Sequence, residues 1–171
     1  MKIGIYMGST TGNTEAAADA IKAEFDKKDP GLCEIFNVKT ADLSTTSAYD
    51  LVIIGCPTWN VGELQEDWES QLPTLKSMSF PGKKLAFFGC GDQDGYLNNF
   101  QDALGIIGKE VVERGAEVYG FWPTDDYDFV QSEGVVDQHF VGLALDDDNE
   151  PEKTDARIEA WVKQLCLELG I

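Results

Sequence analysis

The chain has 171 residues, 43% of them hydrophobic, and 31 acidic residues against 13 basic ones give it a formal charge of −18. This length suits a single domain, residues 1–171, that buries about 70% of the surface its unfolded chain exposes. The negative charge disfavours nucleic acid and anionic membranes as partners, and no apolar stretch approaches the ~20 residues of a membrane span.

Apolar runs at regular intervals predict the strands. Residues 3–7, 51–56 and 85–89 are rich in Val, Ile and Phe and are too continuous for half-solvated strands, so we expect central parallel strands there. Weaker signals at 34–38 and 117–121 predict the edges of the same sheet.

Helical patterns lie between these runs. A short helix is predicted over residues 65–75, and three longer apolar stripes predict helices that cover the sheet. Strands that alternate with helices favour right-handed βαβ units and an α/β fold. The stripes consist of Ala17, Ala18, Ile21 and Phe25; of Phe100, Leu104, Ile107 and Val111; and of Ile158, Trp161, Val162, Leu165 and Leu169.

One long irregular segment, residues 122–138, separates the strand at 117–121 from a second strand-like run at 140–145. Loops of this length usually have a role of their own. Long surface insertions also cost little loop-closure entropy, so simple padding over the sheet edge remains an alternative.

The loop of residues 8–14, with the sequence GSTTGNT, follows the first strand and opens directly into a helix. A helix start offers unpaired N–H groups and a positive dipole end, and Ser9, Thr11 and Thr14 add hydroxyl donors. Asn13 stands where a nucleotide-triphosphate loop would carry Lys, so a lone terminal phosphate is the better ligand. An ordinary helix cap is the alternative, since the same residue types are common there.

Two more unusual loops follow strands, with the sequence PTWNVG at 57–62 and a Gly- and Asp-rich stretch at 90–100. Ligands of open parallel sheets bind beyond the carboxyl ends of the strands. In the strand order 2-1-3-4-5 these loops would meet the phosphate loop. Trp59 and Tyr96 would then offer two aromatic faces to a flat heteroaromatic ring with a phosphate tail.

The remaining reactive residues indicate neither catalysis nor metal binding. The four cysteines form no CxxC pair, and Cys56 and Cys90 end apolar runs, as small buried hydrophobic residues do. His139, the only histidine, is expected to be a surface or structural residue. These cysteines suit a reducing compartment, so we expect a cytoplasmic protein, or one in an organelle stroma if a transit peptide has been removed.

The chain resembles a flavodoxin of the long-chain type over essentially its whole length. The resemblance implies a three-layer α/β/α sandwich with a five-stranded parallel sheet in the order 2-1-3-4-5 and an insertion in the last strand. It is carried, in order, by residues 9–14 (STTGNT), 57–60 (PTWN), 91–102 (GDQDGYLNNFQD) and 140–146 (FVGLALD).

The resemblance implies that the cofactor is FMN. Residues 9–14 would bind its phosphate, Trp59 would lie on the inner face of the ring and Tyr96 on the outer face. An acidic residue of the run Asp146–Asp148 would lie near the ribityl chain. The resemblance leaves its position uncertain by one residue, and Asp148 is the residue that we expect there. The full set of expected cofactor-binding residues is Ser9, Thr10, Thr11, Gly12, Asn13, Thr14, Pro57, Thr58, Trp59, Asn60, Val61, Gly62, Cys90, Gly91, Asp92, Tyr96, Asn99, Gln101 and Asp148.

The function implied is that of a monomeric carrier that moves single electrons at low potential between redox proteins. The three loops contain no Lys or Arg, so a negatively charged reduced ring would be disfavoured. The peptide between Asn60 and Val61 would turn with the redox state, and we expect Asn60 to take up the positive φ because Val tolerates it poorly. Expected partners have basic surfaces, such as a ferredoxin–NADP reductase or another low-potential donor or acceptor complex.

Two other classes of function share the fold. An FMN-dependent NAD(P)H–quinone oxidoreductase needs one open ring face, which Trp59 and Tyr96 would both cover. A receiver-like signalling domain needs a carboxylate at the end of the first strand, where this chain has Met7, Gly8 and Ser9.

Overall fold

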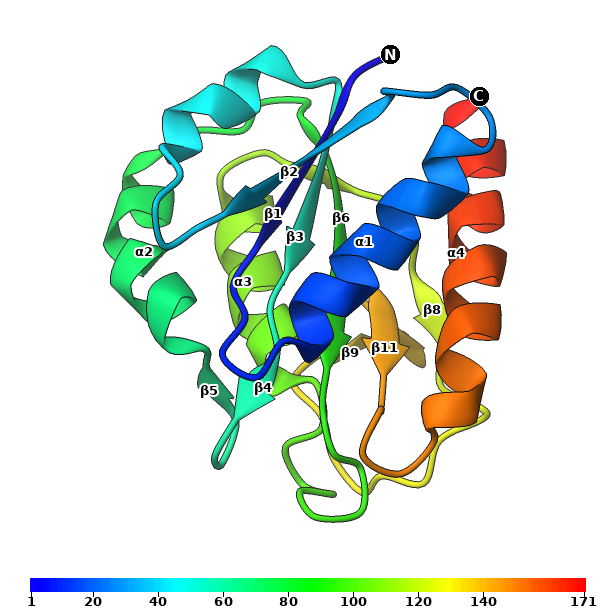
Figure 1. Cartoon of the computed structure of the whole chain (residues 1–171). Helices are drawn as coiled ribbons and strands as arrows, with labels where there is room; N and C mark the ends of the chain where they lie inside the picture. The colour runs from blue at the N-terminus through cyan, green and yellow to red at the C-terminus, as the bar shows by residue number, and fades with distance from the viewer.

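The computed structural model describes residues 1–171 and has a parallel central sheet in the order β2–β1–β3–β6–β11, with β7 also paired to β6 (Figure 1). This is the flavodoxin-like order 2-1-3-4-5, with the last position shared by β7 and β11. The strands of this sheet are β1 (Ile3–Met7), β2 (Cys33–Asn37), β3 (Leu51–Gly55), β6 (Lys84–Cys90), β7 (Glu117–Val118) and β11 (Leu143–Leu145).

Helices cover both faces of the sheet, which makes the three layers predicted from the sequence. Helices α1 and α4 pack against each other on one face, and α2 and α3 pack on the other (Figure 1). No helix is both long enough and apolar enough to cross a membrane. The helices are α1 (Asn13–Asp26), α2 (Glu66–Ser77), α3 (Asp102–Glu113) and α4 (Thr154–Leu169), with short 3₁₀ turns η1 (Leu43–Ala48) and η2 (Pro151–Lys153).

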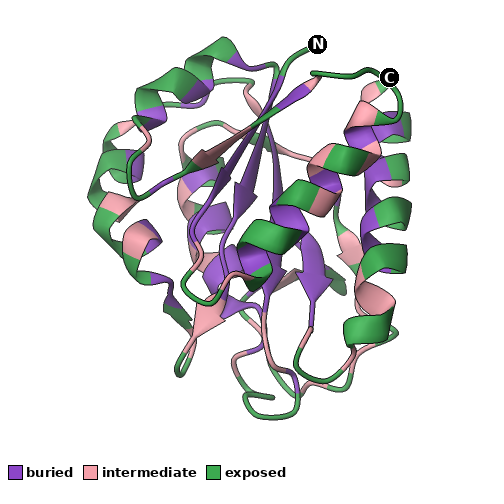
Figure 2. Ribbon diagram, viewed as in Figure 1, coloured by how far each residue is buried: buried purple, intermediate pink, exposed green.

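Successive side chains along each central strand point to opposite faces of the sheet, so the core has two parts, one on each face. Ile3, Ile5 and Met7 of β1 pack with α1 and α4, whereas Tyr6 packs in the cluster with α2 and α3. The central strands β1 and β3 are buried throughout, and the helices are buried only on their inner sides (Figure 2). A strand buried on both faces must be apolar at every position, which is why these runs read as continuous in the sequence.

Two short strands, β7 and β11, share the last position of the sheet, and each pairs with a different part of β6. Glu117 and Val118 of β7 pair with Lys84 and Leu85, while β11 pairs with the other end of β6, from Phe88 to Cys90. The predicted strand at 117–121 is therefore shorter than expected.

The apolar run at 140–145 was wrongly predicted as one strand. Phe140 belongs to a small antiparallel sheet formed by the insertion, and Leu143–Leu145 alone joins the central sheet. Hydrophobicity shows that such a run is buried and says nothing about which of two sheets buries it. The small sheet has β8 (Trp122–Pro123), β9 (Val135–Val136) and β10 (His139–Phe140).

The insertion has an aromatic cluster of its own. The ring of Phe140 lies 5.6 Å from that of Phe100 and 5.2 Å from those of Tyr127 and Phe129, measured between centroids. Phe100, which was expected on the stripe of α3, precedes that helix and packs here instead. The cluster attaches the insertion firmly to the end of the sheet where the loops lie.

Because both faces of β3 are buried, shortening a side chain there should destabilise the fold. Val52, which is 1% exposed, and Val112, which is 51% exposed, offer the same substitution in opposite environments. Val52→Ala should lower the free energy of unfolding by about 2 kcal/mol, because buried methyl groups are lost and a cavity remains. Urea denaturation of the apoprotein measures this, and Val112→Ala, the control, should change it by less than about 0.5 kcal/mol.

Candidate functional site

Three loops meet at one edge of the sheet because β1, β3 and β6 are adjacent and parallel. They enclose a cavity of about 290 Å³. Every residue that lines the cavity except Asp147 was predicted from the sequence. The lining consists of Ser9, Thr10, Thr11, Asn13, Thr14, Pro57, Thr58, Trp59, Asn60, Cys90, Gly91, Asp92, Tyr96, Asp147 and Asp148.

The loop before α1 leaves the helix start free for an anion. Gly12 is the N-cap with φ 97°, a left-handed conformation that favours glycine, and no side chain caps the helix. Ser9 Oγ turns back to accept a hydrogen bond from the Gly12 N–H at 3.1 Å. In α2, by contrast, the side chain of Gln65 accepts from the first N–H groups. The uncapped first turn of α1 is bordered by hydroxyl groups, and its free N–H groups can bind an anion.

The second loop is a hairpin in which β4 (Thr58–Trp59) pairs antiparallel with β5 (Glu63–Leu64). Asn60 has φ 46°, so the residue expected to tolerate a left-handed conformation already adopts it. Gly62 has φ 81°, and a Cβ there would lie 2.5 Å from Asp102 Oδ2. The tight turn holds Trp59 against the cavity.

Trp59 carries an unsatisfied donor. Its ring is partly buried, and its Nε1 atom is buried without a hydrogen-bond partner. Buried polar atoms are rarely left unpaired in a folded protein. An orphaned donor in the wall of a cavity suggests a site that a ligand completes.

The third loop presents Tyr96 at the cavity through a turn built on Asp92. The Asp92 carboxylate accepts from the N–H groups of Gly95 at 2.7 Å and Asp94 at 3.1 Å, and the Tyr96 N–H donates to the Asp92 carbonyl at 3.0 Å. The pKa of Asp92 lies below its usual value. The hydrogen bond from the Gly95 N–H lowers it most, and a hydrogen bond from the side-chain amide of Asn149 comes next. Asp92 is thus a stable carboxylate that fixes the turn.

All charged residues that line the cavity are acidic: Asp92, Asp147 and Asp148. Burial raises the pKa of Asp148, and repulsion from Asp92, Asp146 and Asp147 adds to it. A group that adds negative charge to this cavity therefore meets uncompensated carboxylates.

Neither Cys90 nor His139 offers a reactive group to the cavity. Burial, reinforced by the charge of Asp147, raises the pKa of the Cys90 thiol to about 12, so the thiol is protonated at neutral pH. His139 is exposed in the insertion and lies outside the cavity lining, as expected of a surface residue.

Several predicted residues do not line the cavity. Val61 is 71% exposed at the tip of the hairpin, and Asn99 donates to Asp102 Oδ2 at 2.9 Å. Gln101 is fully buried, and its amide donates to the carbonyls of Gly89 at 3.1 Å and Leu145 at 3.2 Å. A sequence motif does not separate ligand contacts from the residues that hold the loop behind them. The predicted residues outside the lining are Gly12, Val61, Gly62, Asn99 and Gln101.

Asp147 lines the cavity beside Asp148 and was not singled out from the sequence. The run Asp146–Asp148 identified the place but not the residue. Asp146 is the buried member and accepts from the Gln93 and Asn149 N–H groups at 3.1 Å each. The two following carboxylates lie at the cavity.

Comparison with known proteins gives a consistent answer over the whole chain. Residues 5–161 match the family model described as Flavodoxin. The chain is 48% identical to the flavodoxin of Synechococcus elongatus over 99% of both chains, and 45% identical to flavodoxin 1 of Escherichia coli over 98% of this chain and 94% of that protein. The solved structure of a Fusobacterium nucleatum flavodoxin bound to flavin mononucleotide superposes with a TM-score of 0.91, at 30% identity and 98% coverage of each chain. The chain therefore belongs to the flavodoxin family.

Proposed function

We propose that the chain binds FMN without covalent attachment in the cavity between the three loops and carries single electrons at low potential between redox proteins. The observation that carries this proposal is the meeting of an uncapped, hydroxyl-lined helix start with Trp59 and Tyr96 in one cavity. Flavodoxins are electron-transfer proteins rather than enzymes, and the Fusobacterium nucleatum relative is described as bound to flavin mononucleotide.

In this proposal residues 9–14 bind the phosphate, and Trp59 and Tyr96 cover the two faces of the ring. Backbone groups of Asn60, Val61 and Asp92 meet the ring edge. Thr58 and Asp148 lie beside the ribityl chain. The side chain of Thr58 already accepts a hydrogen bond from the Ala103 N–H at 3.2 Å, which leaves its hydroxyl hydrogen free to donate to a ligand.

Bound FMN supplies a ring that can take up one or two electrons. The chain's own contribution is electrostatic: Asp92, Asp147 and Asp148 line the cavity, and no Lys or Arg does. This environment disfavours added negative charge, which lowers the potential at which the last electron enters. With both ring faces covered, no nicotinamide can stack, so exchange of electrons at the ring edge is favoured over hydride transfer.

The charge distribution favours a basic partner at this edge. Lys2, Lys83 and Lys84 lie at or just before the amino ends of β1 and β6, the end of the sheet opposite the cavity. Two of the cationic groups at the cavity end of the sheet, Lys153 and Arg157, are paired with Asp126 and Glu150. The cavity edge therefore presents carboxylates of this chain that no nearby cation neutralises. These carboxylates steer partners with basic surfaces toward the cavity edge.

Removal of the phosphate from the ligand tests the anion-binding site at the start of α1. Riboflavin should bind at least about 100-fold more weakly than FMN, because it cannot accept the charge-assisted hydrogen bonds of the helix start. Flavin fluorescence quenching measures both affinities. Inorganic phosphate, as a control, should compete with FMN and not with riboflavin. Equal affinities for the two flavins would show that the start of α1 does not bind the phosphate.

Replacement of the aromatic residues tests the ring site. Trp59→Ala should weaken FMN binding by about 1–3 kcal/mol through lost stacking and packing. Tyr96→Ala should cost about 1 kcal/mol, because the side chain is 45% exposed. Phe121→Ala, which removes an aromatic ring 37% exposed and outside the cavity, should leave the affinity unchanged. Unaltered binding and quenching in both site variants would contradict this placement of the ring.

Salt tests the carrier role. The rate constant for reduction of the holoprotein by a ferredoxin–NADP reductase should fall steeply as ionic strength rises, since attraction is screened over about 10 Å at 0.1 M. Stopped-flow mixing across a salt series measures it, with an acidic reductant as control. A flat dependence, or rapid oxidation of NAD(P)H with a quinone by the protein alone, would favour the oxidoreductase alternative.

A further inference from the structure

Between Gly91 and Asn99, the loop that carries Asp92 and Tyr96 has one buried side chain. From Asp94 to Asn98 the residues are exposed, and Asp92 is only partly buried, but Gln93 is 3% exposed. A polar side chain is buried at a cost unless its hydrogen bonds are made, so its partners indicate what it does.

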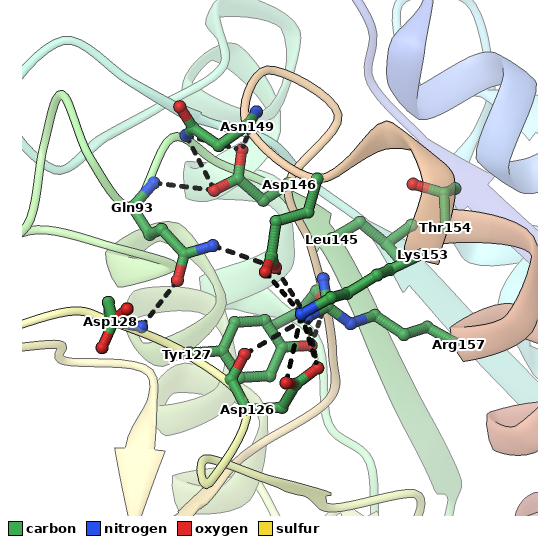
Figure 3. A network of polar contacts seen from close by, with 12 residues as sticks. Gln93, Asp126, Tyr127, Asp128, Leu145, Asp146, Asn149, Lys153, Thr154 and Arg157 are labelled. Carbon is green, nitrogen blue, oxygen red and sulfur yellow. Dashed lines mark hydrogen bonds and ion pairs between the residues drawn. The ribbon is translucent and has the colours of Figure 1, made fainter.

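Gln93 joins the loop to two other segments (Figure 3). Its side-chain oxygen accepts from the N–H of Asp128 in the insertion at 2.7 Å. Its amide donates to Glu150 Oε2 at 3.1 Å, and its backbone N–H donates to Asp146 Oδ2 at 3.1 Å. The amide group therefore bridges the insertion and the segment that leads into α4.

These partners are themselves held in place. Arg157 of α4 donates to Glu150 at 2.7 Å and to Asp126 at 2.9 Å, and its guanidinium lies 4.2 Å from the centre of the Tyr127 ring (Figure 3). Lys153 bonds the same two carboxylates. Burial would raise the pKa of Glu150, but the hydrogen bonds from Lys153, Arg157 and Gln93 outweigh it and lower that pKa. Gln93 is thus anchored to charged groups of fixed position.

The insertion also holds the loop on the far side of Tyr96. The carbonyl of Leu97 accepts from the N–H groups of Val130 at 2.7 Å and Gln131 at 3.0 Å. Tyr96 therefore lies between two points, Gln93 and Leu97, at which the insertion contacts the loop.

We propose that Gln93 is a positioning residue that holds Asp92 and Tyr96 in their binding geometry before the flavin arrives. The inference rests on the proposed FMN site. A loop that samples other conformations binds with an affinity reduced by the fraction of time that it is competent, so a pre-ordered loop strengthens binding without touching the ligand. The insertion then acts through Gln93 on the cofactor site.

The test uses Gln93→Met, which keeps the length and approximate volume of the side chain and removes its amide. Gln71→Met is the matched control, because the amide of Gln71 likewise joins α2 to the carbonyls of Val38 at 3.0 Å and Ala41 at 3.5 Å, away from the cavity. The measurements are FMN affinity, visible circular dichroism of the bound flavin and the unfolding midpoint of each apoprotein.

Gln93→Met should weaken FMN binding about tenfold, as expected for the loss of a well-made hydrogen-bond bridge, and should change the flavin dichroism. Gln71→Met should lower the unfolding midpoint to a similar extent and leave affinity and dichroism at the wild-type values. If both variants bind FMN as the wild type does, the positioning role is wrong. If the wild type itself fails to bind FMN, the proposed function fails instead.

Hydrogen exchange of the wild-type apoprotein tests the same point without a variant that must fold. The amides of Gly95 and Tyr96 donate to Asp92, so they should be protected before FMN is added. Free exchange of these amides until FMN binds would overturn the proposal.

Discussion

The site depends on one constraint, the parallel pairing of β1, β3 and β6. Parallel neighbours bring their carboxyl ends to the same edge, and the register aligns Met7 with Gly55 and Gly55 with Phe88. Loops separated by more than thirty positions in the chain therefore start within two strand spacings of one another, about 10 Å. The apolar side chains that bury both faces of these strands hold the site together more than any contact inside it.

In the proposed function, cofactor binding and electron donation place opposite electrostatic demands on the cavity. The uncapped start of α1 would attract the phosphate, whereas Asp92, Asp147 and Asp148 would repel negative charge on the rest of the ligand. Anchoring at one end of an extended ligand lets the protein tolerate an unfavourable environment at the other. Hydroxyl and backbone donors suit this division, because a Lys for the phosphate would also stabilise the reduced ring.

The sequence predicted the three-layer fold and nearly all the cavity lining because strand-end loops of special composition are local signals. Leu51–Gly55 is apolar at every position and could only be a buried strand. Phe100, Phe140 and Gln101 were misplaced because their surroundings come from distant segments, namely the insertion and β11. Gln93 was passed over for the same reason: nothing in its sequence neighbourhood indicates that Asp128 and Glu150 lie against it.

The buried cysteines bear on what kind of redox protein this is. All four are free and buried, and burial raises the pKa of Cys33, Cys56 and Cys90 to about 12 each. Thiol–disulfide exchange needs an accessible thiolate, which these residues do not provide. Burial therefore keeps these thiols out of glutathione and thioredoxin chemistry, so in the proposed function electrons would enter and leave through the flavin and not through the polypeptide.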